Sequence, residues 1–187
     1  MALTKENVMK LFQFIIFNLS DIMSHNISDV YDLFTSFYDG NTACTEGWKT
    51  NKQFKCNRKV ILTNIAESEH YAGCYREYFT TTYYADRNLE DNDKAMCWLA
   101  GRNYDDLTGT VDVPGQGKTP SPLNSTLRQT LLRIRVGDQD WHESAFFRLK
   151  AFKKGTLHLE FKDEALWTKF TQVVNKEKNL VGDNEAA

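Results

Sequence analysis

The sequence predicts a single α+β domain, and three observations lead to this prediction. Helical periodicity opens the chain, and a β-hairpin followed by an amphipathic helix closes it. With 187 residues, 41% of them hydrophobic and 13% aromatic, the chain has enough apolar area for a core. We expect N-terminal helices, a central mixed region with a long mobile loop, and a C-terminal β-hairpin packed on a terminal helix. The domain should span residues 1–178, followed by a frayed tail at 179–187.

Two helices are expected at the N-terminus. Thr4 can cap a first helix, in which apolar residues recur every three or four positions through Met23. The most apolar run, residues 11–17, is too short to cross a membrane and lacks the flanks of a secretory signal, so we expect a buried helix. Ser28 predicts the N-cap of a short second helix that stops at residues 39–40.

The middle of the chain mixes strand and helix signals. Residues 59–63 suit either a strand or a buried turn of helix, and residues 75–85 suit a strand. Asp91 or Asn92 would cap a helix that ends at Gly101.

A loop and a further regular element follow this helix. All three prolines and three of the ten glycines fall between residues 109 and 122, which predicts a mobile loop there. Residues 127–136 then indicate a regular element that Gly137 closes.

The C-terminal third has the clearest pattern. Residues 145–152 and 156–162 alternate apolar and polar side chains around a turn at Gly155, which predicts a β-hairpin. In its second strand one side is apolar, and the helix that Asp163 caps should cover that side. The residues expected in this contact are Leu157, Leu159 and Phe161 of the strand and Leu166, Trp167 and Phe170 of the helix.

The distribution of charge limits which kinds of ligand the chain can attract. The net charge of −2 predicts no overall attraction to nucleic acid or to an acidic membrane, so such a site must be a local patch. The clearest patch lies at residues 46–62, with cations for phosphates and rings for stacking; a solvated loop face is the competing interpretation. Its residues are Trp48, Lys49, Lys52, Phe54, Lys55, Arg58 and Lys59, and Arg128, Arg133 and Arg135 could extend it.

A metal-dependent nuclease is the alternative hypothesis. Glu160 and Lys162 share one side of a strand, and with Asp138 or Asp140 upstream they match the residue types of an Asp, Glu-x-Lys site that holds Mg²⁺. His158 on the same side has the chemistry of a general base. An exposed cross-strand charge pattern, with an ordinary polar-face histidine, explains the same residues without catalysis.

Zinc is the second metal considered. Four residues have side chains that could act as zinc ligands. They are Cys44, Cys56, His70 and Cys74. Structural zinc sites usually include two cysteines close together in the sequence, and this chain has no such pair. We therefore expect no bound metal or cofactor, and free thiols in a reducing cytoplasm.

The C-terminal motif resembles the signature of a bacterial and phage family, the domain of unknown function 4942. The family has an aromatic-Lys-Lys/Asn-Gly turn, a strand that holds a histidine, then Phe-Lys/Arg and a helix; here these are residues 152–155, His158 and residues 161–162. Four earlier segments are similar to the family in the same order: residues 29–34, 50–54, 59–62 and 91–101. The chain departs from the family at residues 57–58, Asn-Arg, where a glycine is usual.

The resemblance implies a setting and no mechanism. Such domains occur in phages, plasmids and prophage islands, sometimes fused to an adenine methyltransferase or near toxin and antitoxin genes. This chain has neither an Asn/Asp-Pro-Pro-aromatic tetrapeptide nor a glycine-rich cofactor loop, so it is not that methyltransferase. We expect a cytoplasmic accessory protein of a phage or mobile element. It would bind a host or phage protein, or nucleic acid, in host defence, anti-defence or DNA modification, with no role at a membrane.

Overall fold

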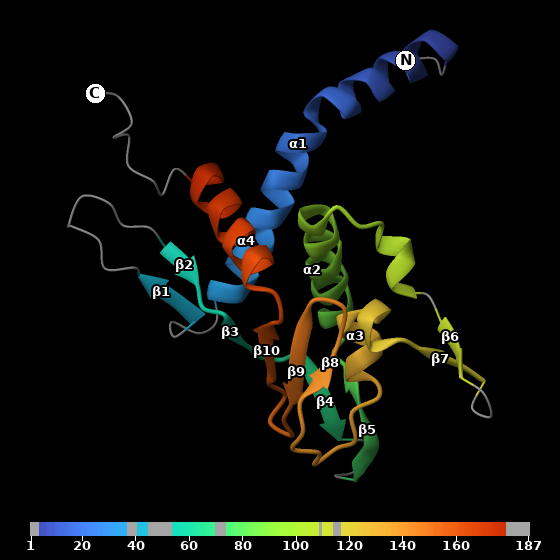
Figure 1. Cartoon of the computed structure of the whole chain (residues 1–187), viewed down its shortest axis with the longest axis vertical. Coiled ribbons are helices and arrows are strands. Elements are labelled where there is room, and N and C mark those ends of the chain that lie inside the picture. Colours follow the sequence, from blue (N-terminus) through green and yellow to red (C-terminus); the bar gives the residue numbers. More distant parts are fainter. Residues whose placement is uncertain are drawn as a thin grey trace.

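The structure, a computed structural model, describes residues 4–36, 41–44, 54–69, 74–108, 110–113 and 117–178. Helices and antiparallel strands make an α+β fold, as the sequence predicts (Figure 1). The helices are α1 (Lys5–Thr35), α2 (Ala85–Ala100), α3 (Leu127–Leu131) and α4 (Glu164–Glu177), with two short 3-10 helices, η3 (Tyr104–Thr108) and η4 (Pro122–Asn124). The strands are β1 (Thr42–Cys44), β2 (Phe54–Cys56), β3 (Lys59–Leu62), β4 (Ala66–Glu69), β5 (Tyr75–Thr81), β6 (Thr110–Val113), β7 (Gly117–Pro120), β8 (His142–Glu143), β9 (Phe147–Ala151) and β10 (Leu157–Phe161).

Four strands form the main sheet, in the order β3-β10-β9-β8, and each neighbouring pair is antiparallel. On β10, Leu157, Leu159 and Phe161 are buried, while His158 and Glu160 between them are partly exposed. The alternation therefore turns one side of the sheet, the inner face, toward the core. Three two-stranded sheets, β1-β2, β4-β5 and β6-β7, complete the strands.

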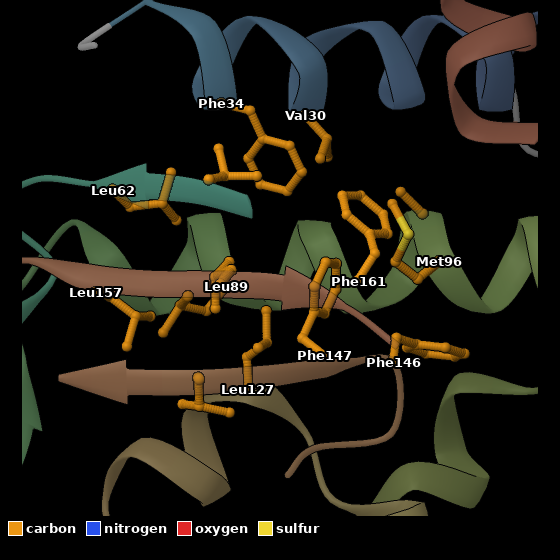
Figure 2. Close-up of a cluster of buried hydrophobic side chains, with 14 of the residues drawn as sticks. Val30, Phe34, Leu62, Leu89, Met96, Leu127, Phe146, Phe147, Leu157 and Phe161 are labelled. Atoms are coloured by element: carbon orange, nitrogen blue, oxygen red, sulfur yellow. The ribbon is translucent and has the colours of Figure 1, made fainter. Parts of the chain in front are cut away.

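An aromatic cluster joins α1 to the inner face and to α4. The ring centroid of Phe34 on α1 lies 6.4 Å from that of Phe147 and 6.2 Å from that of Phe161. Phe170 of α4 adds a fourth ring, 5.7 Å from Phe161. Figure 2 shows Phe34 pointing from α1 toward the sheet strands that carry Phe147 and Phe161. Burial of each such side chain contributes roughly 1.5–3 kcal/mol, so this cluster is a principal anchor of the fold.

The C-terminal hairpin and helix are as predicted. β9 and β10 pair in register around a turn in which Gly155 has φ of 88°, a conformation that glycine adopts without strain. The Asp163 side chain then accepts a hydrogen bond from the Ala165 backbone N–H at 2.8 Å and caps α4. Leu166 and Phe170 are buried, so α4 packs against the inner face of the hairpin.

The N-terminal prediction was wrong in two respects. A single helix, α1, runs through Ser28, which is buried within it and caps nothing. Thr4 is the N-cap as predicted, and its side chain accepts from Asn7 N–H at 3.3 Å. No glycine or proline interrupts residues 4–36, and the apolar stripe keeps its helical phase, so the helix continues. Its residues become buried only from Ile27 onward, whereas the expected buried segment 11–17 is exposed.

The predicted start of α2 was wrong, and its predicted end is confirmed. α2 begins at Ala85, so the predicted caps Asp91 and Asn92 both lie in its interior, where Asp91 is exposed and Asn92 is buried. Gly101 at its C-cap has φ of 65°, the left-handed conformation expected there. Residues 59–63, which suited either a strand or a turn of helix, contain β3, and the strand expected at 75–85 is β5, which ends at Thr81.

The segment expected to be a loop at 109–122 contains the paired strands β6 and β7. Its mobility stays a prediction. The element expected at 127–136 is the short helix α3, where Thr126 and Gln129 form a capping box, followed by turns up to Gly137. Within the described ranges, no helix combines the length and apolarity needed to cross a membrane. The predicted tail at 179–187 lies outside the described residues.

Candidate functional site

The side of the main sheet opposite the core, the outer face, gathers charged and aromatic side chains. Antiparallel partners point to the same side of a sheet, so the register places Lys59, Glu160, Arg148 and Glu143 in one row across β3, β10, β9 and β8. Further members come from the same strands and their flanking turns. We define the outer face by Lys59, Trp141, Glu143, Arg148, Lys150, Phe152, Lys154, His158, Glu160 and Lys162.

Cations outnumber carboxylates on the outer face, five to two. Lys59 Nζ lies 3.8 Å from Glu160 Oε2, and the Lys59 side chain is 68% exposed. Lys162 Nζ lies 3.2 Å from Glu143 Oε2 and donates to the Ser144 carbonyl at 3.0 Å. These two pairs neutralise both carboxylates. Arg148, Lys150 and Lys154 therefore leave a net positive surface on a chain whose overall charge is −2.

Two aromatic rings lie among these cations. The Arg148 guanidinium lies 5.7 Å from the Trp141 ring centroid, and Lys150 Nζ lies 5.6 Å from that of Phe152. The His158 ring lies against Phe152, with centroids 4.5 Å apart. All three rings are partly exposed, so the outer face offers π surfaces beside positive charge.

The surroundings of His158 favour the neutral form of its imidazole. Burial lowers its pKa below the usual value, and the charges of Lys154 and Lys150 lower it further. This imidazole lies against an aromatic ring and near two cations, so it resembles a stacking group more than a base activated by a carboxylate.

The structure places the predicted basic patch only in part. Trp48, Lys49 and Lys52, and the side chains of Phe54 and Lys55, lie outside what is described. Lys59 is on the outer face. The nearby Arg58 guanidinium donates to the carbonyls of Phe161 at 3.0 Å and Lys162 at 3.2 Å, so it joins the ends of β3 and β10.

The other predicted arginines are not members of the outer face, and each contacts a side chain outside it. Arg128 Nε lies 2.8 Å from Asp86, and Arg135 pairs with Glu77 at 3.4 Å. Arg133 donates to Ser125 Oγ at 2.9 Å. Arg133 also lines a shallow cavity beside β8, together with Trp141, His142 and Glu143, and so borders the outer face.

The residues of the nuclease hypothesis do not converge. Asp138 Oδ2 lies 3.0 Å from His142 Nε2, and Asp138 Oδ1 accepts the Asp140 backbone N–H at 2.8 Å. That backbone bond is the main cause of the lowered Asp138 pKa, and the His142 contact adds to it. β9 separates this loop and β8 from Glu160 on β10. Within the described residues, no group of three or more His, Cys, Asp or Glu side chains could hold a metal ion. This geometry does not favour a Mg²⁺ site.

The zinc hypothesis concerns residues that are described only in part. Cys56 is a buried free thiol, and burial raises its pKa to about 12, which disfavours the thiolate that zinc needs. Cys74 is an exposed free thiol. His70 and the side chain of Cys44 lie outside the described residues.

Sequence reasoning missed six members of the outer face, which are Trp141, Glu143, Arg148, Lys150, Phe152 and Lys154. Arg148 and Lys150 alternate with buried Leu149, and the same period-two argument used for β10 would have found them. Phe152 continues that alternation past the end of β9. Trp141 lies in an irregular stretch before β8, and no periodic signal marks it.

Fold and site together define an α+β domain with helices on the inner face of an antiparallel sheet and a cationic, aromatic outer face. The family model described as domain of unknown function DUF4942 matches residues 1–179. The chain belongs to this family, in agreement with the resemblance of its C-terminal motif. No curated protein and no solved structure matches it.

Proposed function

We propose that the chain acts by binding a macromolecule, and that the outer face binds single-stranded nucleic acid. The observation that carries this proposal is the interleaving of Arg148, Lys150 and Lys154 with the rings of Trp141 and Phe152 on one side of the sheet. Cations neutralise phosphates without regard to sequence, and exposed rings stack on unpaired bases.

A sheet surface suits this task because its backbone is already fixed. The hydrogen bonds of β9 to both β8 and β10 hold the strands that carry these side chains, so little backbone entropy is lost on binding. Unpaired bases can lie flat against such a surface, whereas a base pair in a duplex hides its faces. Single strands are therefore the favoured ligand.

The same contacts support binding over catalysis. Glu160 and Glu143 each have a lysine within 4 Å, and Asp138 is held by His142. Because each carboxylate has a basic partner, it repels a phosphate backbone less than a free carboxylate would. Among the described residues, these carboxylates form no group that could hold Mg²⁺.

Salt-dependent titration tests the proposal. Labelled single-stranded DNA and RNA are titrated with wild type and with Arg148→Ala/Lys154→Ala, which removes two exposed cations of the outer face. Each lost phosphate contact lowers the slope of log K against log salt by about 0.7 for a single strand, so we expect a decrease of about 1.4. The matched control is Lys10→Ala/Lys176→Ala, which removes the same charge from exposed helix positions and should keep the wild-type slope.

Removal of an aromatic ring from the outer face provides a second test of the proposal. Phe152→Ala should weaken binding by about 1–3 kcal/mol with an unchanged salt slope, because it removes stacking and no charge. Undetectable binding of wild type at low salt would refute the nucleic-acid proposal and leave a protein partner. A wild-type slope in Arg148→Ala/Lys154→Ala would show that the ligand binds elsewhere.

The setting belongs to the same proposal. We infer from family resemblance that the binding serves a phage or mobile element, in host defence, anti-defence or DNA modification in the bacterial cytoplasm. Its support is the residue motifs given above, from the Asp29 segment to the C-terminal helix.

A further inference from the structure

The outer part of α1, residues 5–26, carries the largest set of exposed apolar side chains in the described chain. Figure 1 shows this part of the helix extending away from the sheet and from the other helices. Nine large apolar residues on it are between 37% and 87% exposed. They are Met9, Leu11, Phe12, Phe14, Ile15, Ile16, Phe17, Leu19 and Ile22.

Most of these side chains form one stripe. Val8, Phe12, Ile15, Leu19 and Ile22 follow each other at steps of four and three residues, which keeps them on one side of a helix. Leu11 and Ile16 flank the stripe. In the inner part of α1 the buried residues, Val30 and Phe34 among them, lie on an adjacent side of the helix, rotated by about 90° from the stripe.

We propose that a second copy of this chain covers the stripe, with the two α1 helices packed side by side in antiparallel directions. This proposal does not depend on the proposed function, because α1 and the outer face are different parts of the molecule. Most of the stability of a helix in a protein comes from packing of its apolar face, and the described residues leave the apolar side chains of this part of α1 exposed.

The size of the stripe matches what a stable dimer needs. Stable interfaces bury about 800 Å² per partner, and a packed aromatic side chain alone covers about 150–250 Å². Six of the nine exposed residues lie on or beside the stripe, and Met9, Phe14 and Phe17 lie outside it. Monomeric proteins rarely expose a continuous apolar patch of this extent.

The position of the rest of the domain, the sheet with α2, α3, α4 and the inner part of α1, favours the antiparallel arrangement. We call this part the body. α2 and α4 both pack against the inner part of α1 and occupy its apolar side. In a parallel pair, the bodies of both copies would compete for the same space beside that inner part. In an antiparallel pair each body lies beyond the N-terminus of its partner's helix. The centre of the stripe is Ile15, so the two-fold axis passes near this residue.

The charges on α1 favour a protein over a lipid surface. Helices that lie on membranes carry a cationic polar side. Between residues 5 and 26, Lys5 and Lys10 are balanced by Glu6 and Asp21, and Lys10 is paired with Glu6 at 2.7 Å. A neutral polar side is compatible with packing against an identical helix, because no like charges meet across the stripe.

Mass measurement tests the association. Sedimentation equilibrium of the full chain should give twice the 21.6 kDa chain mass for wild type and the single mass for Ile15→Glu. Phe17→Glu is the matched control, since two residues rotate by about 200° and place Phe17 opposite the stripe. This control should remain dimeric. A monomeric wild type, or equal effects of the two substitutions, would overturn the proposal.

Crosslinking tests the direction of the helices. In a Cys44→Ser/Cys74→Ser background, Ile15→Cys should form an intermolecular disulfide because it lies at the two-fold axis. Ile22→Cys should not, since its symmetry mate lies at the other end of the stripe. Crosslinking of both variants would show a parallel pair and refute the antiparallel arrangement. Recruitment of a monomeric wild type to phosphatidylserine vesicles would refute the dimer and assign the stripe to a lipid surface.

Discussion

Helix α4 and the outer part of α1 have the same kind of apolar stripe and opposite surroundings. In α4, Leu166, Phe170 and Val174 lie against the inner face of the sheet and are at most 7% exposed. In α1, Phe12 on the stripe and Ile16 beside it are 56% and 69% exposed. Periodicity thus determines which side of a helix is apolar, and says nothing about what covers it. Coverage depends on whether the chain supplies a partner surface, and for the outer part of α1 it supplies none among the described residues.

The largest expected effect compares one phenylalanine from each region. Phe161→Ala removes a fully buried ring of the aromatic cluster and should lower the free energy of unfolding by about 3–5 kcal/mol. Phe17→Ala removes a ring that is 87% exposed and should change it by at most about 0.5 kcal/mol. Denaturant unfolding followed by tryptophan fluorescence, at low protein concentration, measures both. A large loss for Phe17→Ala would mean that outer α1 is part of the cooperative core.

The two regions also show what the sequence could predict. The hairpin and α4 depend on local signals, a glycine turn and the Asp163 cap, and both are in the structure. The start of α2 was missed because Asp91 and Asn92, residue types that are typical of N-caps, lie inside the helix. Local sequence could not reveal the full outer face, because β3 and β10 are about a hundred residues apart and meet only through pairings such as Arg58 with Phe161.

A buried carboxyl in α2 gives the second prediction, a pH dependence. Burial raises the pKa of Asp93 to about 8, although the Leu127 backbone N–H donates to its Oδ2 at 2.8 Å. The unfolded chain loses this proton near pH 4, while the folded chain keeps it up to about pH 8. Between these values the folded state binds more protons, so its stability must fall as pH rises.

Asp93→Asn tests this dependence, because the amide oxygen can still accept from Leu127 and never ionises. Unfolding free energies at several pH values between 4 and 8 should decline less steeply in the variant than in wild type. The Asp91→Asn control, at an exposed position of the same helix, should follow the wild-type curve. Parallel curves for wild type and Asp93→Asn would show that Asp93 ionises normally in the folded protein. Outer α1 contains no comparable buried group, so this pH dependence belongs to the body alone.

The smallest expected effect compares two helix caps. Thr126 Oγ1 accepts the Gln129 backbone N–H at 3.1 Å in a buried capping box, and Thr126→Ala should lower the free energy of unfolding by about 1 kcal/mol. Thr4 makes the same kind of bond at the exposed start of α1. Thr4→Ala should leave global stability unchanged within about 0.5 kcal/mol, because that end frays before the body unfolds. Chemical denaturation at low protein concentration measures the body, and amide hydrogen exchange near residues 5–8 reports the local effect. A Thr4→Ala loss equal to that of Thr126→Ala would place the outer part of α1 in the same cooperative unit as α3.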